Sequence, residues 1–135
     1  MAPSRWETPR PLPGVRPLRT TLRTAHTLAF AALYGGHVYG IAAEPLRPAL
    51  VATVASGLAL MALEMYRTPV WPVQLRGLAA FAKLALVAAV GLWWNARVAL
   101  LSAAIVIGGV ASHMPGRYRY YSVLHGRVVG ATEAG

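Results

Sequence analysis

Two histidines of this chain are spaced so that they could hold a haem group between two helices. His26 lies near the start of the first long apolar stretch and His113 at the end of the last one, so we expect both at the same depth of a helical bundle. Imidazole is a common axial ligand of haem iron, and helical bundles mount cofactors between facing helices. The pair therefore predicts a b-type haem. The alternative is that each histidine only hydrogen-bonds lipid phosphate, water or a helix end.

A third histidine, His37, follows His26 by eleven residues and falls on the same helical stripe, about 16 Å further along the axis. An ionisable side chain at that depth of a membrane is rare unless it faces the bundle interior and has a partner. One interpretation is a small transporter or ligand-binding bundle around His37, and the other is a neutral histidine hydrogen-bonded inside the bundle. Besides a bound ligand, the candidate partners are Tyr34, Thr53, Ser56 and Ser102.

Glu64 and Lys83 are charged residues within the second and third apolar stretches. Opposite charges in lipid pair with each other, and a lysine stem reaches several ångströms, so we expect a Glu64–Lys83 ion pair. The alternative is a proton relay or a site for a quinone headgroup, because Tyr66, His26 and His113 are expected at a similar depth.

The chain lacks the motifs of enzymes and metal proteins. It contains no cysteine and no aspartate, and none of the H-x-x-x-H, G-x-S-x-G or P-loop patterns. Disulfides, thiolate metal sites and cysteine nucleophiles are therefore excluded. We expect no catalytic residues and no metal site. The net charge of +9 does not indicate a nucleic-acid binder, because the basic residues lie mostly outside the apolar stretches, as in proteins held against anionic headgroups.

Four apolar stretches must position these side chains, and they cover residues 24–43, 48–66, 78–94 and 98–113. Each reaches or approaches the roughly 20 residues that a helix needs to cross a hydrocarbon core about 30 Å thick. A chain of 135 residues with 56% hydrophobic and 13% charged residues also has too little polar surface for a water-soluble globule. The sequence predicts an all-α integral membrane protein, an up-down bundle of four helices.

The arginines predict how this bundle is oriented. Residues 1–23 form a basic, proline-rich tail that we expect to be extended, and residues 114–135 form a second basic tail. Both tails share one arginine-rich side with the connection at residues 67–76, whereas Arg47 and Arg97 stand alone on the other side. By the positive-inside rule both termini face the cytoplasm, of what we expect to be a bacterial inner membrane.

The ends of the stretches carry more local signals. We expect connections at residues 44–48 and 95–97, and Pro115-Gly116 should end the fourth helix. The second tail alternates basic and aromatic residues, which suits a segment that lies along headgroups or docks a partner. The residues expected to make these contacts are Arg117, Tyr118, Arg119, Tyr120 and Tyr121.

Small residues recur at four-residue spacing in the first and fourth stretches, as Ala32, Gly36, Gly40 and as Ala104, Gly108, Ser112. This spacing favours close helix packing or an oligomer interface, although spans rich in alanine and glycine also produce it by chance. The string His26-Thr-Leu-Ala-Phe with Gly35-Gly36-His37 resembles the opening helix of copper-resistance D-like and related four-span membrane proteins. No activity is transferred to this chain from that resemblance.

Three functional hypotheses follow from the sequence. The first is a small membrane subunit, an accessory or anchor protein whose cytoplasmic tails contact the bilayer and dock partner subunits or a second copy. The second is a membrane subunit for electron transfer that binds haem b or interacts with quinone. The third is the transporter or ligand-binding bundle around His37.

Overall fold

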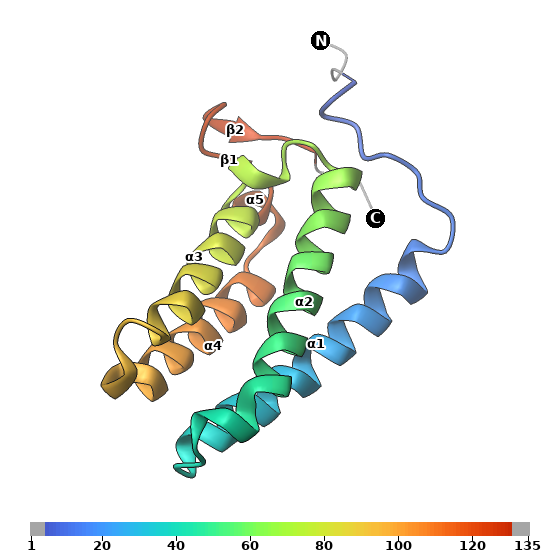
Figure 1. The fold of residues 1–135 in the computed structure, drawn as a ribbon. Coiled ribbons are helices and arrows are strands. Elements are labelled where there is room, and N and C mark those ends of the chain that lie inside the picture. The colour runs from blue at the N-terminus through green and yellow to red at the C-terminus, as the bar shows by residue number, and fades with distance from the viewer. Residues whose placement is uncertain (1–4, 131–135) are drawn as a thin grey trace.

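The structure, a computed structural model, describes residues 5–130, and helices dominate this range (Figure 1). The four long helices are α1 (Val15–Val38), α2 (Ala43–Arg67), α3 (Leu75–Val90) and α4 (Arg97–His113). The shorter elements are the 3₁₀ turns η1 (Trp71–Val73) and η2 (Trp94–Ala96), helix α5 (Gly116–Arg119), and the antiparallel strands β1 (Tyr121–Ser122) and β2 (Arg127–Val128). The all-α prediction is confirmed.

The long helices form two antiparallel hairpins, α1 with α2 and α3 with α4. The hairpins touch each other much less, through limited contacts between α1 and α4 and between α2 and α3. At one end of the bundle lie the α2–α3 connection, the β1–β2 pair and the segment before α1, and at the other end lie the α1–α2 and α3–α4 connections (Figure 1). The two ends therefore differ in composition and construction.

Helix α1 begins at Val15, so the prediction of an extended tail up to residue 23 is wrong for its last part. Pro17 lies in the first turn of the helix, where its missing N–H costs nothing because that group has no partner inside the helix. A proline-rich composition was therefore compatible with a helix start. The extra turns carry Arg16, Arg19 and Arg23 along α1 as helical residues.

Helix α2 begins at Ala43, so the prediction of a connection at residues 44–48 is also wrong. Pro45 occupies the first turn, and Pro48 lies inside the helix. The real connection is shorter and is made by Gly40, whose φ of 71° is left-handed. Ile41 N–H donates to Gly36 O at 2.9 Å, the bond that closes a helix end around such a glycine.

The second hairpin has a compact connection as well. Helix α3 ends at Val90, earlier than the predicted residue 94, and η2 leads directly into α4. Helix α4 ends at His113, just before Pro115-Gly116, which confirms the predicted stop. Proline cannot continue a helix, because its ring clashes with the preceding turn and it has no N–H.

Two helical stretches are long and apolar enough to cross a membrane, namely Ala43–Arg67 and Trp94–His113. Among residues 5–130 the other two helices do not meet the same criteria of length and composition. Helix α3 has 16 residues, and α1 carries arginines, threonines and two histidines. Two of the four predicted spans are thus long and apolar enough to cross a membrane, and the membrane bundle itself stays a prediction.

The outward helix faces are apolar, and the buried core is small. Leu33, Leu101 and Ala104 are almost fully buried, whereas Leu28 and Val51 are 67% and 65% exposed in the middle of their helices. Scattered apolar side chains on a surface are ordinary, but extended apolar faces on surface helices mark a contact with lipid or protein. The chain alone does not cover these faces.

The predicted small-residue spacing coincides with close helix contacts. A Cβ atom on Gly36 would overlap the Leu46 side chain of α2, so only glycine allows this approach of α1 and α2. On α4, Ala104 is buried, and a Cβ on Gly108 would lie 3.6 Å from Cδ of Lys83 on α3. Gly40 makes no such contact, because it forms the turn.

Candidate functional site

His26 is held by α2. Its Nδ1 atom lies 3.0 Å from the backbone oxygen of Thr53 and 3.0 Å from Oγ of Ser56. A carbonyl only accepts, so Nδ1–H donates to Thr53 O. A Cβ on Gly57 would lie 3.1 Å from Cε1 of His26, so the glycine leaves room for the ring. His26 therefore fastens α1 to α2.

His113 is exposed, and its Nδ1 lies 2.9 Å from Gly109 O one turn earlier on α4. The ring folds back on its own helix, whereas His26 faces α2. The structure does not bring the two candidate haem ligands together as a facing pair. The haem hypothesis stays a prediction from the sequence, without support from the geometry.

His37 is buried, with 5% of its surface exposed, and its Nδ1 has no hydrogen-bond partner. Its ring meets the Trp94 ring edge-on, with 5.3 Å between centroids. The protein partners expected for His37 are engaged elsewhere, because Thr53 and Ser56 bind His26, and Tyr34 Oη lies 3.0 Å from Ser102 Oγ. The expectation of a partner among these four residues is wrong, and the ring nitrogen is left for a ligand.

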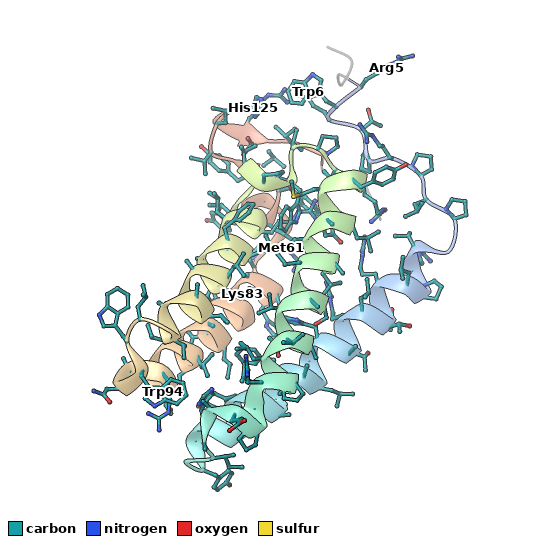
Figure 2. The ribbon with its side chains drawn as sticks, viewed as in Figure 1. Arg5, Trp6, Met61, Lys83, Trp94 and His125 are labelled. Carbon is teal, nitrogen blue, oxygen red and sulfur yellow. The ribbon has the colours of Figure 1, made fainter. Side chains whose placement is uncertain are left out.

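A cavity of about 410 Å³ adjoins His37. All four long helices contribute to its wall, which is mostly aliphatic, and Trp94 closes it at the end of the bundle opposite to Trp6 and His125 (Figure 2). Arg47 is the one charged residue among the described lining residues. A mostly apolar cavity with few polar groups is typical of a small-molecule site.

Glu64 does not pair with Lys83, and that prediction is wrong. Its Oε1 lies 3.0 Å from Nε of Arg19, and its Oε2 lies 3.5 Å from an Nη atom of Arg76. The helical start of α1 brings Arg19 to this carboxylate, and Arg76 at the start of α3 is nearer to it than Lys83, two turns further on. Burial lowers the pKa of the Arg76 guanidinium, and the Glu64 charge opposes that effect.

The remaining members of the predicted relay are apart from Glu64. Tyr66 is exposed, and the Arg10 guanidinium lies over its ring at 5.4 Å. Lys83 projects from the middle of α3 and packs beside Gly108 of α4 (Figure 2). Among residues 5–130 no carboxylate lies within ion-pair distance of Lys83. No hydrogen bond or ion pair among residues 5–130 joins Glu64 to the other four residues, and the relay stays a prediction from the sequence.

The two predicted tails are folded together over one end of the bundle. We call this unit the cap, and it consists of residues 5–13, 68–74 and 116–130. Gln74 is fully buried in it, where Nε2 donates to Val129 O at 2.6 Å and Oε1 accepts from Nε of Arg76 at 2.7 Å. Val123 N–H donates to Val73 O at 3.0 Å. These bonds tie the last described segment to the α2–α3 connection.

The segment before α1 completes the cap. Arg10 N–H donates to Arg67 O at the end of α2, at 2.7 Å, and Glu7 forms an ion pair with Arg127. The Trp6 and His125 rings lie 5.1 Å apart, at the outer edge of the cap (Figure 2). Three distant parts of the chain thus form one unit.

The residues expected to contact headgroups or a partner divide into two groups. Arg119 donates to Ser112 O at 2.6 Å, and Tyr120 lies under the Arg76 guanidinium at 4.8 Å, so both fasten the cap to the bundle. Tyr118 is 47% exposed with Arg117 stacked on it at 4.7 Å. Tyr121 lies in β1 at the surface. Arg117, Tyr118 and Tyr121 are exposed, whereas Arg119 and Tyr120 are half-buried, so the second group offers more surface for an external contact.

Comparison of this chain with protein-family models, with curated proteins and with solved structures gives no match. Within the described residues, no three histidine or carboxylate side chains gather as metal ligands would. The two features of the molecule that bear on its function are the cap and the cavity beside His37.

Proposed function

We propose that this chain is a four-span integral membrane subunit that acts as an accessory or anchor protein and docks a partner protein through the cap. The observation that carries this proposal is the cap itself. Both described end segments and the α2–α3 connection fold into one unit. This unit lies on the arginine-rich end of an apolar bundle.

The membrane part of the proposal is supported by the distribution of charge. Helix α2 and the stretch Trp94–His113 are each long and apolar enough to cross a membrane. Helix α1 packs along α2 and α3 along α4, and the exposed residues of α3, and of α1 from Leu28 on, are mostly apolar. Helix α3 spans about 24 Å at 1.5 Å per residue, and Gly91 to Trp93 extend it toward the bundle end. Between Thr24 and Val38, α1 carries no formal charge. All four helices then cross the bilayer.

The orientation follows from the arginines. Seven of them lie in or beside the cap, whereas the opposite end has two, Arg47 and Arg97. Cytoplasmic loops carry the excess of basic residues, so the cap faces the cytoplasm, in a bacterial inner membrane as we expect from the sequence. The seven arginines are Arg5, Arg10, Arg67, Arg76, Arg117, Arg119 and Arg127.

The outer surface of the cap has the chemistry of a protein interface. Trp6, Val123 and Leu124 are exposed there, Leu124 at 74%, and Tyr118 with Arg117 lies on the same unit. Tryptophan, tyrosine and arginine are the residues that interface hot spots favour. The basic surroundings suit a partner with an acidic surface.

The test is co-purification from a mild detergent at native expression level, with identification of the chains recovered. The double variant Trp6→Ala with Leu124→Ser should lose the partner, because it removes the exposed apolar surface of the cap. Leu92→Ser is the matched control, because Leu92 is 77% exposed at the opposite end. A lone species from the unaltered protein, or equal recovery with the cap variant, would contradict the proposal.

A further inference from the structure

We infer that the cavity beside His37 is a binding site for one anionic phospholipid, taken from the leaflet at the bundle end opposite to the cap. The acyl chain fills the cavity, an ester carbonyl accepts a hydrogen bond from His37, and the phosphate lies against Arg47 and Arg97. This inference rests on the membrane placement proposed above, but not on a partner at the cap.

His37 supplies the polar contact inside the site. Its side chain lines the cavity, it is 95% buried, and its Nδ1 is without a hydrogen-bond partner. Buried polar groups are nearly always hydrogen-bonded, so an unpartnered nitrogen at the wall of a cavity indicates a missing ligand. With a proton on Nδ1 the ring donates, and the oxygen of an ester carbonyl is a suitable acceptor.

The walls of the cavity suit a hydrocarbon chain. Leu50 and Val54 of α2 face Leu84 and Val87 of α3, and the volume of about 410 Å³ falls in the roughly 300–1,000 Å³ range of ligand sites. Helices α2 and α3 make few contacts with each other, and Leu50 at the edge is 40% exposed. The cavity is therefore open on a flank that faces lipid in the proposed placement, and a chain enters sideways.

The charges at this end select the headgroup. Arg47 lines the cavity, and the Arg97 guanidinium lies over the Trp94 ring at 4.9 Å, next to His37. Neither arginine forms an ion pair with a carboxylate of residues 5–130. Arg47 lies in the cavity wall, and Arg97 lies beside the lining residue Trp94, to whose carbonyl it donates. Two such cations without a carboxylate partner among residues 5–130 favour a phosphate, which arginine binds through paired N–H donors.

The first experiment compares two lipids with identical chains on the full-length protein in mild detergent. Dioleoyl phosphatidylglycerol and dioleoyl phosphatidylcholine are titrated separately, and bound lipid is counted by native mass spectrometry. We expect one phosphatidylglycerol molecule to bind at least tenfold more tightly than phosphatidylcholine. Equal affinity for the two lipids would overturn the proposed selectivity for an anionic headgroup. Tighter binding of a short-chain ubiquinone than of either lipid would overturn the proposal that the ligand is a phospholipid.

The second experiment places the site. Leu50→Trp fills the cavity from its edge and should lower the affinity for phosphatidylglycerol at least tenfold. Val51→Trp is the matched control, because Val51 is 65% exposed and outside the cavity lining. Equal affinities of these two variants would overturn the location, and circular dichroism melting shows that both are folded.

The third experiment distinguishes the contact of Arg47 with the headgroup from the contact of His37 with the ester carbonyl. Arg47→Gln should reduce the preference for phosphatidylglycerol over phosphatidylcholine to less than threefold, whereas Arg117→Gln at the cap should leave it unchanged. His37→Phe should weaken both lipids alike, because the ester carbonyl is common to them. An unchanged preference in Arg47→Gln would overturn the headgroup contact. Lipid binding that persists without any co-purifying partner would leave this inference standing and count only against docking at the cap.

Discussion

The two ends of the bundle differ in the partners of their most informative polar groups, Glu64 and Gln74 at the cap end and Arg47 and His37 at the other, although Nε of Arg67 at the cap end is also buried without a hydrogen bond. At the cap end, Glu64 is paired with two arginines, and Gln74 uses both of its amide atoms. At the other end, Arg47 forms no ion pair with a carboxylate of residues 5–130, and the buried Nδ1 of His37 has no partner. Satisfied polar groups hold a structure together, whereas unsatisfied ones are available to a ligand. The bonds of Glu64 and Gln74 thus stabilise the cap end, whereas Nδ1 of His37 at the other end is available to the ligand that we propose.

The largest effect is expected where the first hairpin closes, at the end with the cavity. Gly36→Val should destabilise the protein by about 3 kcal/mol, because its side chain would overlap Leu46 and push α1 from α2. Gly35→Val is the control, because nothing lies within 4 Å of a Cβ at that position. Thermal unfolding in detergent measures both, and equal melting temperatures would contradict the packing described.

The cap should lose stability when its buried amide is removed. Gln74→Ala removes the hydrogen bonds that Gln74 makes with the Val129 carbonyl and with Nε of Arg76, at a cost of about 2 kcal/mol. We expect faster proteolysis of the segment after α4 in this variant. Asn95→Ala, an exposed change at the other end, should behave like the unaltered protein. Unchanged proteolysis in Gln74→Ala would mean that the cap is not held in this way.

The charge cluster beneath the cap is a smaller contributor. Glu64→Gln should lower the free energy of unfolding by about 1 kcal/mol, because Glu64 and its arginine partners are partly exposed. Glu44→Gln serves as control, because the structure shows Glu44 in no ion pair within residues 5–130. Denaturant unfolding in detergent compares the two. A larger loss for Glu44→Gln would reverse the assignment.

The smallest expected signal is spectroscopic. His26 donates to α2 and His113 lies along its own helix, so we expect no Soret band from the purified protein after incubation with haemin. His26→Gln should then change stability only slightly and leave the absorption spectrum unchanged. A Soret band lost in both His26→Gln and His113→Gln would restore the haem hypothesis.

The helices could largely be predicted from the sequence, because apolar stretches of this length have few other structures. Their starts could not. Pro17, Pro45 and Pro48 are typical of breaks, yet α1 and α2 begin before them. Proline is accepted in the first turn, which accounts for Pro17 and Pro45, whereas Pro48 lies further inside α2. The close contact at Gly36 followed from the small-residue spacing.

The site was less accessible to prediction. Glu64 pairs with Arg19 and not with Lys83, because α1 begins at Val15, before the apolar stretch that starts at residue 24. No local sequence pattern reveals this earlier helix start. The cap depends on pairs of residues far apart in sequence, such as Gln74 with Ser122, which no local pattern predicts. For the β1–β2 pair the one local signal is Gly126, which has a φ of 62° in the turn between the two strands. The position of His37 in the bundle interior was expected, but its missing partner required the structure.

The central claim is that this bundle crosses a membrane with the cap on the cytoplasmic side, and one labelling experiment tests it directly. The chain has no cysteine, so single cysteines at Leu124, Leu92 and Val51 can be labelled with a membrane-impermeant maleimide in spheroplasts and in inverted vesicles. We predict that Leu124→Cys reacts only in inverted vesicles, Leu92→Cys only in spheroplasts, and Val51→Cys in neither. Labelling of Leu124→Cys and Leu92→Cys from the same side, or of Val51→Cys from either, would contradict the account.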